Sequence, residues 1–477
     1  MREGRRRFVP LACVFAVVLA ALVVGLCAGA AAPARAAAPP AHSLWWTVLY
    51  GPVNTNISQF VDVAEGPDGS LYAGGMYNGT LGDDNGDLLV AKFNASDAAT
   101  THMVWTHTWD DPDAHLFDKA EAIAVDRSGA VIAAGITETA SNATSWVVAK
   151  WSTHGTALWQ KTFAASTLVA EYAFAWDVAC DHAGNVYVCG MVQTGTSGGH
   201  DVTSLVVRKL ARTDGHVIWT HAYKGYPDSY NAATRLALDP AGNVYCTGDA
   251  TSAHGDEDII ACKLRSSDGH QVWARRIAGA KHLDDEGTDI AVRGGGVWVT
   301  GGEYTGASTR EVVLAKYTLA GKLLWTRTWL EQAKTREYPN AVAVDKHGNA
   351  VVVGAGNDDP VTREHAFVLR YSSAGVLSWR RISYDTVSHE AEWIDVVCDA
   401  AGNIWVGGDT DTGSSEAFLV ARYSASGARP WRSIWKGPDG LAGECDALCF
   451  GKTGLFAAGT ITTIAGGAGA AAVKFTR

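Results

Sequence analysis

The strongest constraint on the fold is a motif that recurs along nearly the whole chain. Its clearest copy covers residues 341–379. This copy has an apolar run, a turn with Gly348, a second apolar run closed by Gly354, a third run closed by Arg370, and a fourth run opened by Trp379. Self-similarity at a regular spacing indicates a repeat architecture, in which each copy is one structural unit.

Three markers of the motif recur independently of one another. A glycine closes the second run at positions 75, 135, 190, 248, 301, 354, 408 and 459. A basic residue ends the third run as Lys92, Lys150, Lys209, Lys263, Lys316, Arg370, Arg422 and Lys474. A tryptophan opens the fourth run as Trp105, Trp159, Trp219, Trp273, Trp325, Trp379 and Trp431. The markers give eight, eight and seven copies, so one copy lacks its fourth run.

The missing fourth run is found at the other end of the chain. Residues 44–47, which include Trp46, resemble a fourth run and precede the first copy, whereas the last copy stops after Lys474 and Phe475. The N-terminal strand is therefore predicted to complete the last repeat by pairing with the C-terminal strands. Such closure removes exposed sheet edges, which otherwise invite aggregation.

Each copy predicts four short antiparallel strands. The runs are rich in β-branched and aromatic residues, as in Val186, Tyr187 and Val188, and glycine-containing turns separate them. The chain contains 52 glycines and only 13 prolines, which suits many tight turns. Eight such copies predict an all-β fold, a single eight-bladed β-propeller over residues 43–477, because a blade needs neighbours to cover both of its faces.

The tryptophans that open the fourth runs are expected to pack between blades. A tryptophan can bury on the order of 200 Å² while its indole N–H finds a backbone acceptor. We therefore assign them a structural inter-blade role instead of ligand stacking. The set is Trp46, Trp105, Trp159, Trp219, Trp273, Trp325, Trp379 and Trp431.

Three segments link this repeat to known propeller groups. Residues 214–219 and 268–273 share the pattern Asp-Gly-His-x-x-Trp and look like the tryptophan-docking repeats of quinoprotein-dehydrogenase-like (PQQ-like) propellers. Residues 345–354 are similar to the SBBP-type β-propeller repeats of bacterial proteins. The resemblance covers nearly all of residues 43–477 and implies an eight-bladed fold. Both groups include proteins without a known activity, so the resemblance implies no particular function.

Residues 1–36 are interpreted as an export signal. Three consecutive arginines precede an apolar run that starts at Phe8, and small residues follow with an A-x-A pattern at 34–36. Residues 37–42 then form a linker. The alternative is an uncleaved membrane anchor, because the apolar run approaches the ~20 residues that span a bilayer. We expect cleavage, no membrane span in the mature chain, and a secreted, periplasmic or cell-surface location.

The charge of the chain restricts its partners. The formal net charge is −11 at pH 7, and five of the arginines fall within the first 38 residues, so the remainder is more acidic still. An acidic surface repels phosphate backbones, and a nucleic-acid partner is therefore not expected. A protein or carbohydrate partner is considered instead, and a monomer is expected.

The sharpest candidate site is a ring of first-run residues. It appears when the first runs are aligned on the glycine that lies 13 residues later, or 12 in the fifth copy. The aligned position holds Asp62, Ala122, Asp177, Arg235, Asp289, Ala341, Asp395 and Asp446. At a channel mouth these groups would bind a cation such as calcium, or a cationic or polyhydroxylated ligand. The alternative, which we favour, is that the aspartates cap loop N–H groups or hold ordered water.

The cysteines leave several pairings open. Cys13 and Cys27 belong to the signal, and seven cysteines remain after it, so at least one is unpaired or intermolecular. Cys398 and Cys449 occupy equivalent first-run positions, and a bridge between them is one hypothesis. The favoured alternative is two buried thiols, since free cysteine packs as a small apolar residue.

The leading functional hypothesis is an exported, non-catalytic scaffold that binds a protein or ligand on the face of its longer loops. The rival is a quinoprotein-type oxidoreductase. That family implies a vicinal cysteine pair and a calcium-bound quinone, and this sequence has no adjacent cysteines. The third hypothesis is a glycan hydrolase or lyase, for which no carboxylate pair can be placed. No catalytic residue is assigned and no cofactor is expected, with calcium at the ring as the alternative.

Overall fold

The computed structural model divides the chain into two compact units, Met1–Pro39 and Pro40–Arg477, and all described residues belong to the second. The described residues are 44–50, 56–80, 86–96, 102–111, 115–139, 143–164, 172–198, 200–226, 229–358, 364–384, 391–411, 416–429, 431–436, 442–452, 454–462 and 468–475. The predicted export signal and linker lie outside them. Within these ranges, no helix has the length and apolar character needed to cross a bilayer.

The described residues form β-strands and no helix, and consecutive strands make four-stranded antiparallel groups. The first groups are β2 (Asn56–Glu65), β3 (Leu71–Thr80), β4 (Asp87–Phe93) and β5 (Met103–Trp109); β6 (Asp118–Val125), β7 (Val131–Glu138), β8 (Thr144–Trp151) and β9 (Ala157–Ala164); β10 (Ala173–Cys180), β11 (Val186–Ser197), β12 (His200–Leu210) and β13 (Val217–Tyr223); and β14 (Asn231–Leu238), β15 (Val244–Thr251), β16 (Glu257–Leu264) and β17 (Gln271–Ile277).

The second half of the chain repeats this arrangement. Its groups are β18 (Glu286–Arg293), β19 (Gly296–Gly306), β20 (Thr309–Thr318) and β21 (Leu323–Trp329); β22 (Thr335–Val344), β23 (Ala350–Asp358), β24 (Glu364–Tyr371) and β25 (Leu377–Tyr384); β26 (Ala391–Cys398), β27 (Ile404–Asp411), β28 (Glu416–Tyr423) and β29 (Trp431–Trp435); and β30 (Gly443–Phe450), β31 (Leu455–Thr462) and β32 (Ala468–Phe475). The N-terminal strand β1 (Leu44–Tyr50) pairs with β32. Single parallel pairs, Ile57 with Ala468 and Arg310 with Arg336, join neighbouring groups into wider sheets.

A bulge in the first strand of each group explains the marker glycine. In β26, Trp393 pairs with Gly408 and Asp395 pairs with Gly407 of β27, so Ile394 between them has no partner on that strand. A Cβ on Gly408 would lie 2.0 Å from the carbonyl oxygen of Glu392. At the other marker glycines the same distance is between 1.9 and 2.2 Å. Any side chain would collide with the backbone of the bulged strand, so only glycine fits.

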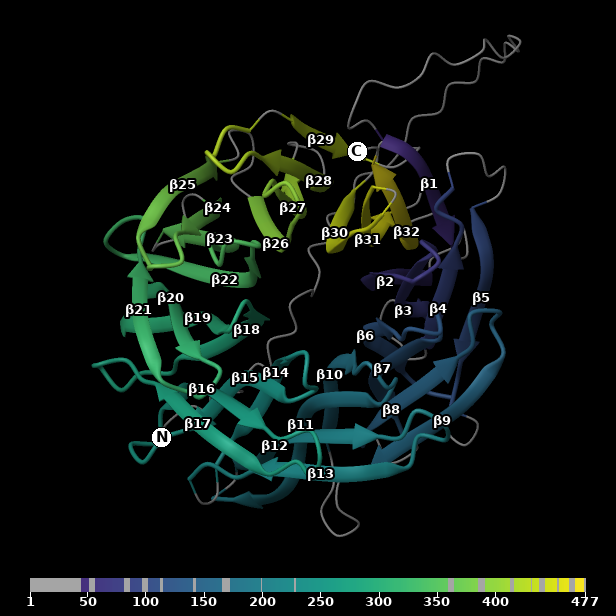
Figure 1. Ribbon diagram of the computed structural model, residues 1–477, viewed down its shortest axis with the longest axis horizontal. Helices are drawn as coiled ribbons and strands as arrows, with labels where there is room; N and C mark the ends of the chain where they lie inside the picture. The colour runs from purple at the N-terminus through teal and green to yellow at the C-terminus, as the bar shows by residue number, and fades with distance from the viewer. Residues whose placement is uncertain are drawn as a thin grey trace. The chain divides into compact units, whose positions relative to one another are not determined.

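The hydrophobic core lies between successive groups. One cluster joins Trp146 and Val148 of β8 to Val188 of β11, and another joins Phe60 of β2 to Phe456 of β31. First strands contact one another in the order β2, β6, β10, β14, β18, β22, β26 and β30, and β30 in turn contacts β2. Figure 1 shows each group beside the next one in chain order. Each sheet therefore buries both faces against its neighbours.

The fourth-strand tryptophans dock on the next group. Trp159 Nε1 donates to the carbonyl of Arg212 at 3.1 Å, and a Cβ on Gly215 would lie 2.6 Å from the Trp159 ring. Lys150 Nζ donates to the same carbonyl at 3.4 Å. The equivalent indole-to-carbonyl bond is made by Trp105, Trp219, Trp273, Trp325 and Trp379. Trp431 meets Phe475 edge-on at 5.5 Å, and the side chain of Trp46 lies outside the described residues.

The two ends of the repeat region contact each other. The backbone of β1 runs antiparallel to β32, with Thr47 opposite Val473. Lys474 Nζ, on β32, donates to the carbonyl of Ala95 at 2.7 Å. This bond matches the bond from Lys150 to the following group, so the last group contacts the first in the same way as the second group contacts the third.

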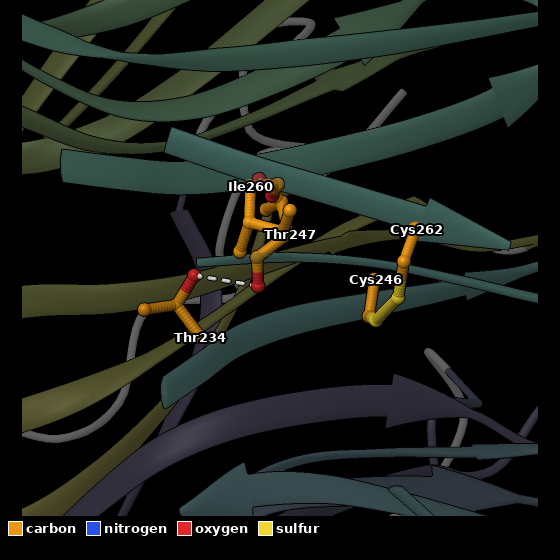
Figure 2. Close-up of a disulfide and its surroundings, with 5 residues drawn as sticks. All are labelled: Thr234, Cys246, Thr247, Ile260 and Cys262. Atoms are coloured by element: carbon orange, nitrogen blue, oxygen red, sulfur yellow. Dashed lines mark hydrogen bonds between the residues drawn. A yellow bond between two sulfur atoms is a disulfide. The ribbon is translucent and has the colours of Figure 1, made fainter. Parts of the chain in front are cut away.

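A disulfide joins two strands within one group. Cys246 on β15 lies directly opposite Cys262 on β16, and both are fully buried (Figure 2). Beside it, Thr234 Oγ1 donates to the carbonyl of Thr247 at 3.3 Å. The bridge suggested between Cys398 and Cys449 is not formed, and both are free cysteines. Their first strands, β26 and β30, are not paired with each other, whereas β15 and β16 are hydrogen-bonded neighbours.

Candidate functional site

In each first strand, the bulge leaves one residue without a partner on the second strand. We define the ring position as the residue directly after that unpartnered one. That position holds Asp62, Ala122, Asp177, Arg235, Asp289, Ala341, Asp395 and Ala447. The placement of Asp446 in the ring was wrong, because the pairing of β30 with β31 skips Asp446 and leaves Ala447 facing Ala458. The turn between these strands is one residue shorter than in the preceding group, which shifts an alignment made on the glycine.

The four ring aspartates share one hydrogen-bonding arrangement. Asp177 Oδ1 accepts the N–H of Val178 on its own strand at 2.8 Å, and Asp177 Oδ2 accepts the N–H of Leu236 on the next first strand at 2.8 Å. The equivalent inter-strand bonds run from Ile123 to Asp62, from Val342 to Asp289, and from Leu448 to Asp395. Both oxygens of each carboxylate are thus engaged with backbone N–H groups, the arrangement given above as the alternative to ligand binding.

The ring groups influence one another electrostatically. Burial raises the pKa of Asp62 to about 7 against its backbone hydrogen bonds, and the charges of Asp177 and Asp395 raise it further. Burial also raises the pKa of Asp289 to about 7, although the bond from Val342 and the charge of Arg235 act in the opposite direction. Burial acts to lower the pKa of Arg235, but nearby carboxylates, Asp177 first, outweigh it and raise that pKa. The ring is therefore a mixed-charge layer tied to the backbone.

A second set of side chains lies where the first strands begin, ahead of the bulges. On β6, Lys119 Nζ and Glu121 Oε2 are 3.1 Å apart. On β10, Tyr172, which immediately precedes the strand, stacks parallel to Phe174 at 6.3 Å, and Phe174 stacks parallel to Trp176 at 5.9 Å. We call Tyr172, Phe174 and Trp176 the aromatic ladder. Tyr172 is 38% exposed, so the ladder is not closed off by packing.

Acidic side chains gather at the same end of β26, β27, β28 and β30. We call this set the acidic cluster: Glu392, Asp409, Glu416, Glu444 and Asp446. Burial and then the charge of Glu392 raise the pKa of Asp409 well above its usual range. Burial and then Glu444 raise the pKa of Asp446, while the charge of Lys119 opposes them. Asn340 Nδ2 donates to Glu392 Oε1 at 2.6 Å.

Apart from Asp446, which was assigned to the ring, sequence reasoning missed the aromatic ladder and the acidic cluster because it followed one aligned position only. Trp176, Glu121 and Asp446 are the residues that the bulges skip, one place before the ring. The usable signal was the aromatic or charged character of Trp176, Glu121 and Asp446, each of which has an alanine on at least one side. Across the described ranges, no three His, Cys, Asp or Glu side chains already converge as metal ligands.

Comparisons with known proteins show the fold. No protein-family model matches the chain, and no curated protein matches it. It is similar to Sqt1 from Saccharomyces cerevisiae, with 9% identity, a TM-score of 0.55, and coverage of 90% of this chain and 98% of that one. It is also similar to the quinohemoprotein alcohol dehydrogenase from Comamonas testosteroni, with 9% identity, a TM-score of 0.51, and coverage of 90% and 76%.

A further similarity is to BamB from Moraxella catarrhalis, with 15% identity, a TM-score of 0.48, and coverage of 90% of this chain and 100% of that one. At such low identity a similarity describes architecture alone. Together with the repeated four-stranded antiparallel sheets, the similarities to Sqt1 and to the quinohemoprotein alcohol dehydrogenase show that the chain has a β-propeller fold. These similarities do not distinguish between the possible functions of the chain.

Proposed function

We propose that the chain is an exported, non-catalytic binding scaffold that holds a positively charged segment of a partner where its first strands begin. The observation that carries this proposal is the acidic cluster beside first strands whose ring aspartates are already engaged. Packing does not require a carboxylate at the position of Asp446, since the equivalent position holds Ile394 in β26 and Thr234 in β14. A cationic partner would relieve the mutual repulsion of the cluster, and Tyr172, the exposed member of the aromatic ladder, supplies a ring face that attracts cations.

The proposal includes an eight-bladed propeller in which β1 completes the last blade. Its support is the bond from Lys474 to Ala95, which repeats the bond from Lys150 to Arg212, together with the pairing of β1 and β32. Hydrophobic clusters at every junction between groups, including β2–β4 with β30–β32, also support it. A rigid closed scaffold would hold the first strands in fixed positions. A partner could then bind without a loss of conformational entropy in these strands.

The binding part is tested with a fluorescein-labelled oligolysine peptide and a matched oligoglutamate peptide. We expect the purified secreted protein to bind oligolysine only, and we expect the Glu444→Gln, Asp446→Asn double variant to weaken that binding several-fold. The matched control is Asp214→Asn, Asp268→Asn, which removes two exposed carboxylates from turns between third and fourth strands. Equal weakening by both double variants would show non-specific attraction to net charge and would contradict the proposal.

The same protein tests the enzymatic alternatives. Uptake of pyrroloquinoline quinone with calcium, accompanied by a redox-dye response, would favour the oxidoreductase. Release of reducing ends or unsaturated sugars from a panel of acidic polysaccharides would favour the glycan enzyme. Export is tested separately by N-terminal sequencing of the processed protein, which we expect to begin near residue 37; a start at Met1 would support the anchor.

A further inference from the structure

Two loops at the same end of adjacent groups bring three potential donors together. The turn at 252–256 connects β15 to β16 and carries His254 and Asp256, and the segment at 278–285 connects β17 to β18 and carries His282. The centroids of the two imidazole rings are 4.0 Å apart. His282 Nδ1 lies 3.9 Å from Asp256 Oδ2. Residues 28 positions apart in the chain thus face one another.

Asp256 is held in a position that leaves one oxygen unsatisfied. It is 6% exposed, and its Oδ1 is bonded to Ser252 Oγ within the turn. Its Oδ2 is shielded from solvent and accepts no hydrogen bond from any described residue. Leaving a buried carboxylate oxygen without a partner is costly. Asp258, 3% exposed, also keeps a shielded oxygen, Oδ1, without a hydrogen bond, while its Oδ2 is 3.0 Å from Arg276 Nη1.

The distance from Asp256 to His282 suits a metal ion better than a hydrogen bond. A separation of 3.9 Å is too long for a hydrogen bond. Zinc binds imidazole nitrogen and carboxylate oxygen at about 2.1 Å, so one ion fits between these two donors. Both loops contain a residue with positive φ: Gly255 has a φ of 83°, and His282 has a φ of 50°, which is unusual for histidine. A rotation of the exposed His254 ring would bring in the third donor.

From this arrangement we infer that His254, Asp256 and His282 form a binding site for a divalent transition-metal ion, zinc being the best match. Two imidazoles and one carboxylate select such an ion over calcium, which prefers an all-oxygen shell. With three protein ligands a fourth position stays open for water or a donor from a partner. The site does not depend on the proposed binding of a cationic partner, because it uses none of the residues of the acidic cluster.

The test is zinc alone, titrated into the purified protein in competition with a chromophoric zinc indicator. We expect one zinc ion per chain, and we expect His282→Ala and His254→Ala each to lower zinc affinity about tenfold or more. Both imidazoles are exposed, so these variants should fold, and circular-dichroism melting verifies this. Cobalt substitution gives a second measurement, because a low-symmetry N/O site produces a visible absorption band that His282→Ala should abolish.

The matched control is His216→Ala. His216 Nδ1 pairs with Asp214 Oδ1 at 2.7 Å on the surface, without a shielded carboxylate oxygen, and its loss should change zinc affinity less than about twofold. If the unaltered protein fails to compete with the indicator, or if His216→Ala weakens binding as much as His282→Ala, the inference is wrong. An unchanged affinity in the acidic-cluster variants separates this site from the proposed function.

Discussion

Lys474 and Ala95 are 379 residues apart in the sequence, yet the ammonium of Lys474 donates to the carbonyl of Ala95 at 2.7 Å. Lys474 is fully buried, and its ammonium also lies over the ring of Phe456 at 5.9 Å. The last group of strands is therefore joined to the first by the same lysine-to-carbonyl bond that joins groups along the chain.

Lys474→Met should destabilise the protein because it leaves the Ala95 carbonyl without its charged donor. The expected loss is about 1.5–3 kcal/mol in the free energy of unfolding, the range for hydrogen bonds to charged groups. Denaturant titration followed by tryptophan fluorescence measures it. Lys322→Met, at an exposed turn position, is the control and should be nearly neutral. Equal midpoints for the two variants would show that the junction of last and first groups adds nothing.

Gly135→Ala should be among the most damaging single substitutions in the chain. A Cβ there would lie 1.9 Å from the carbonyl oxygen of Lys119, so β6 or β7 must shift. We expect a loss of about 3 kcal/mol or more, as for other strained or overpacked sites. Gly195→Ala is the matched control, since nothing lies within 4 Å of its Cβ position and its backbone is ordinary. Thermal melting compares the two, and a similar small shift in both would contradict this account of the marker glycine.

Stability should fall as pH rises from about 4 to 7. Asp62 and Asp289 have folded-state pKa values of about 7, raised mainly by burial, whereas their unfolded values are near 3.8. In this window the folded state keeps protons that the unfolded state has lost, so rising pH favours unfolding. The Asp62→Asn, Asp289→Asn double variant should flatten this slope, measured by denaturant midpoints at several pH values. A slope equal to that of the Asp214→Asn control would refute the assignment.

The chain without residues 1–36 should show five free thiols when it is denatured under non-reducing conditions. Cys246 and Cys262 are joined, and Cys180, Cys189, Cys398, Cys445 and Cys449 are free. Colorimetric thiol titration gives the count, and two further thiols should appear after reduction. Peptide mapping should find the 246–262 link; a link between Cys398 and Cys449 would contradict the structure.

The repeat could be found in the sequence because each marker residue makes one specific local contact that other residue types cannot make equally well. The glycine lies against a bulge, the basic residue bonds a neighbouring turn, and the tryptophan docks on the same carbonyl. Counting back from the glycine gives the residue after the bulge in every copy except the last, where the turn is one residue shorter and the count falls on Asp446. Counting residues across a turn cannot detect a change of turn length.

The disulfide could have been predicted from the same three markers. In every group the marker glycine faces the residue three places before the basic marker, as Gly248 faces Ile260 before Lys263. That register places Cys246 opposite Cys262, whereas aligning first strands alone suggested Cys398 and Cys449. The aromatic ladder and the His254–His282 contact were beyond the sequence, because they depend on side-chain directions in the loops and at the bulges.

The bridging aspartates occur on alternate first strands, from β2 to β6, from β10 to β14, from β18 to β22 and from β26 to β30. The four-stranded group recurs eight times in the sequence pattern, whereas the aspartate bridge recurs only at every second group. Junctions without such a bridge, such as that between β6 and β10, are therefore expected to be the weaker ones. Under mechanical load or limited proteolysis, the molecule should come apart in tandem pairs, and new chain ends made by circular permutation should be tolerated best between those pairs.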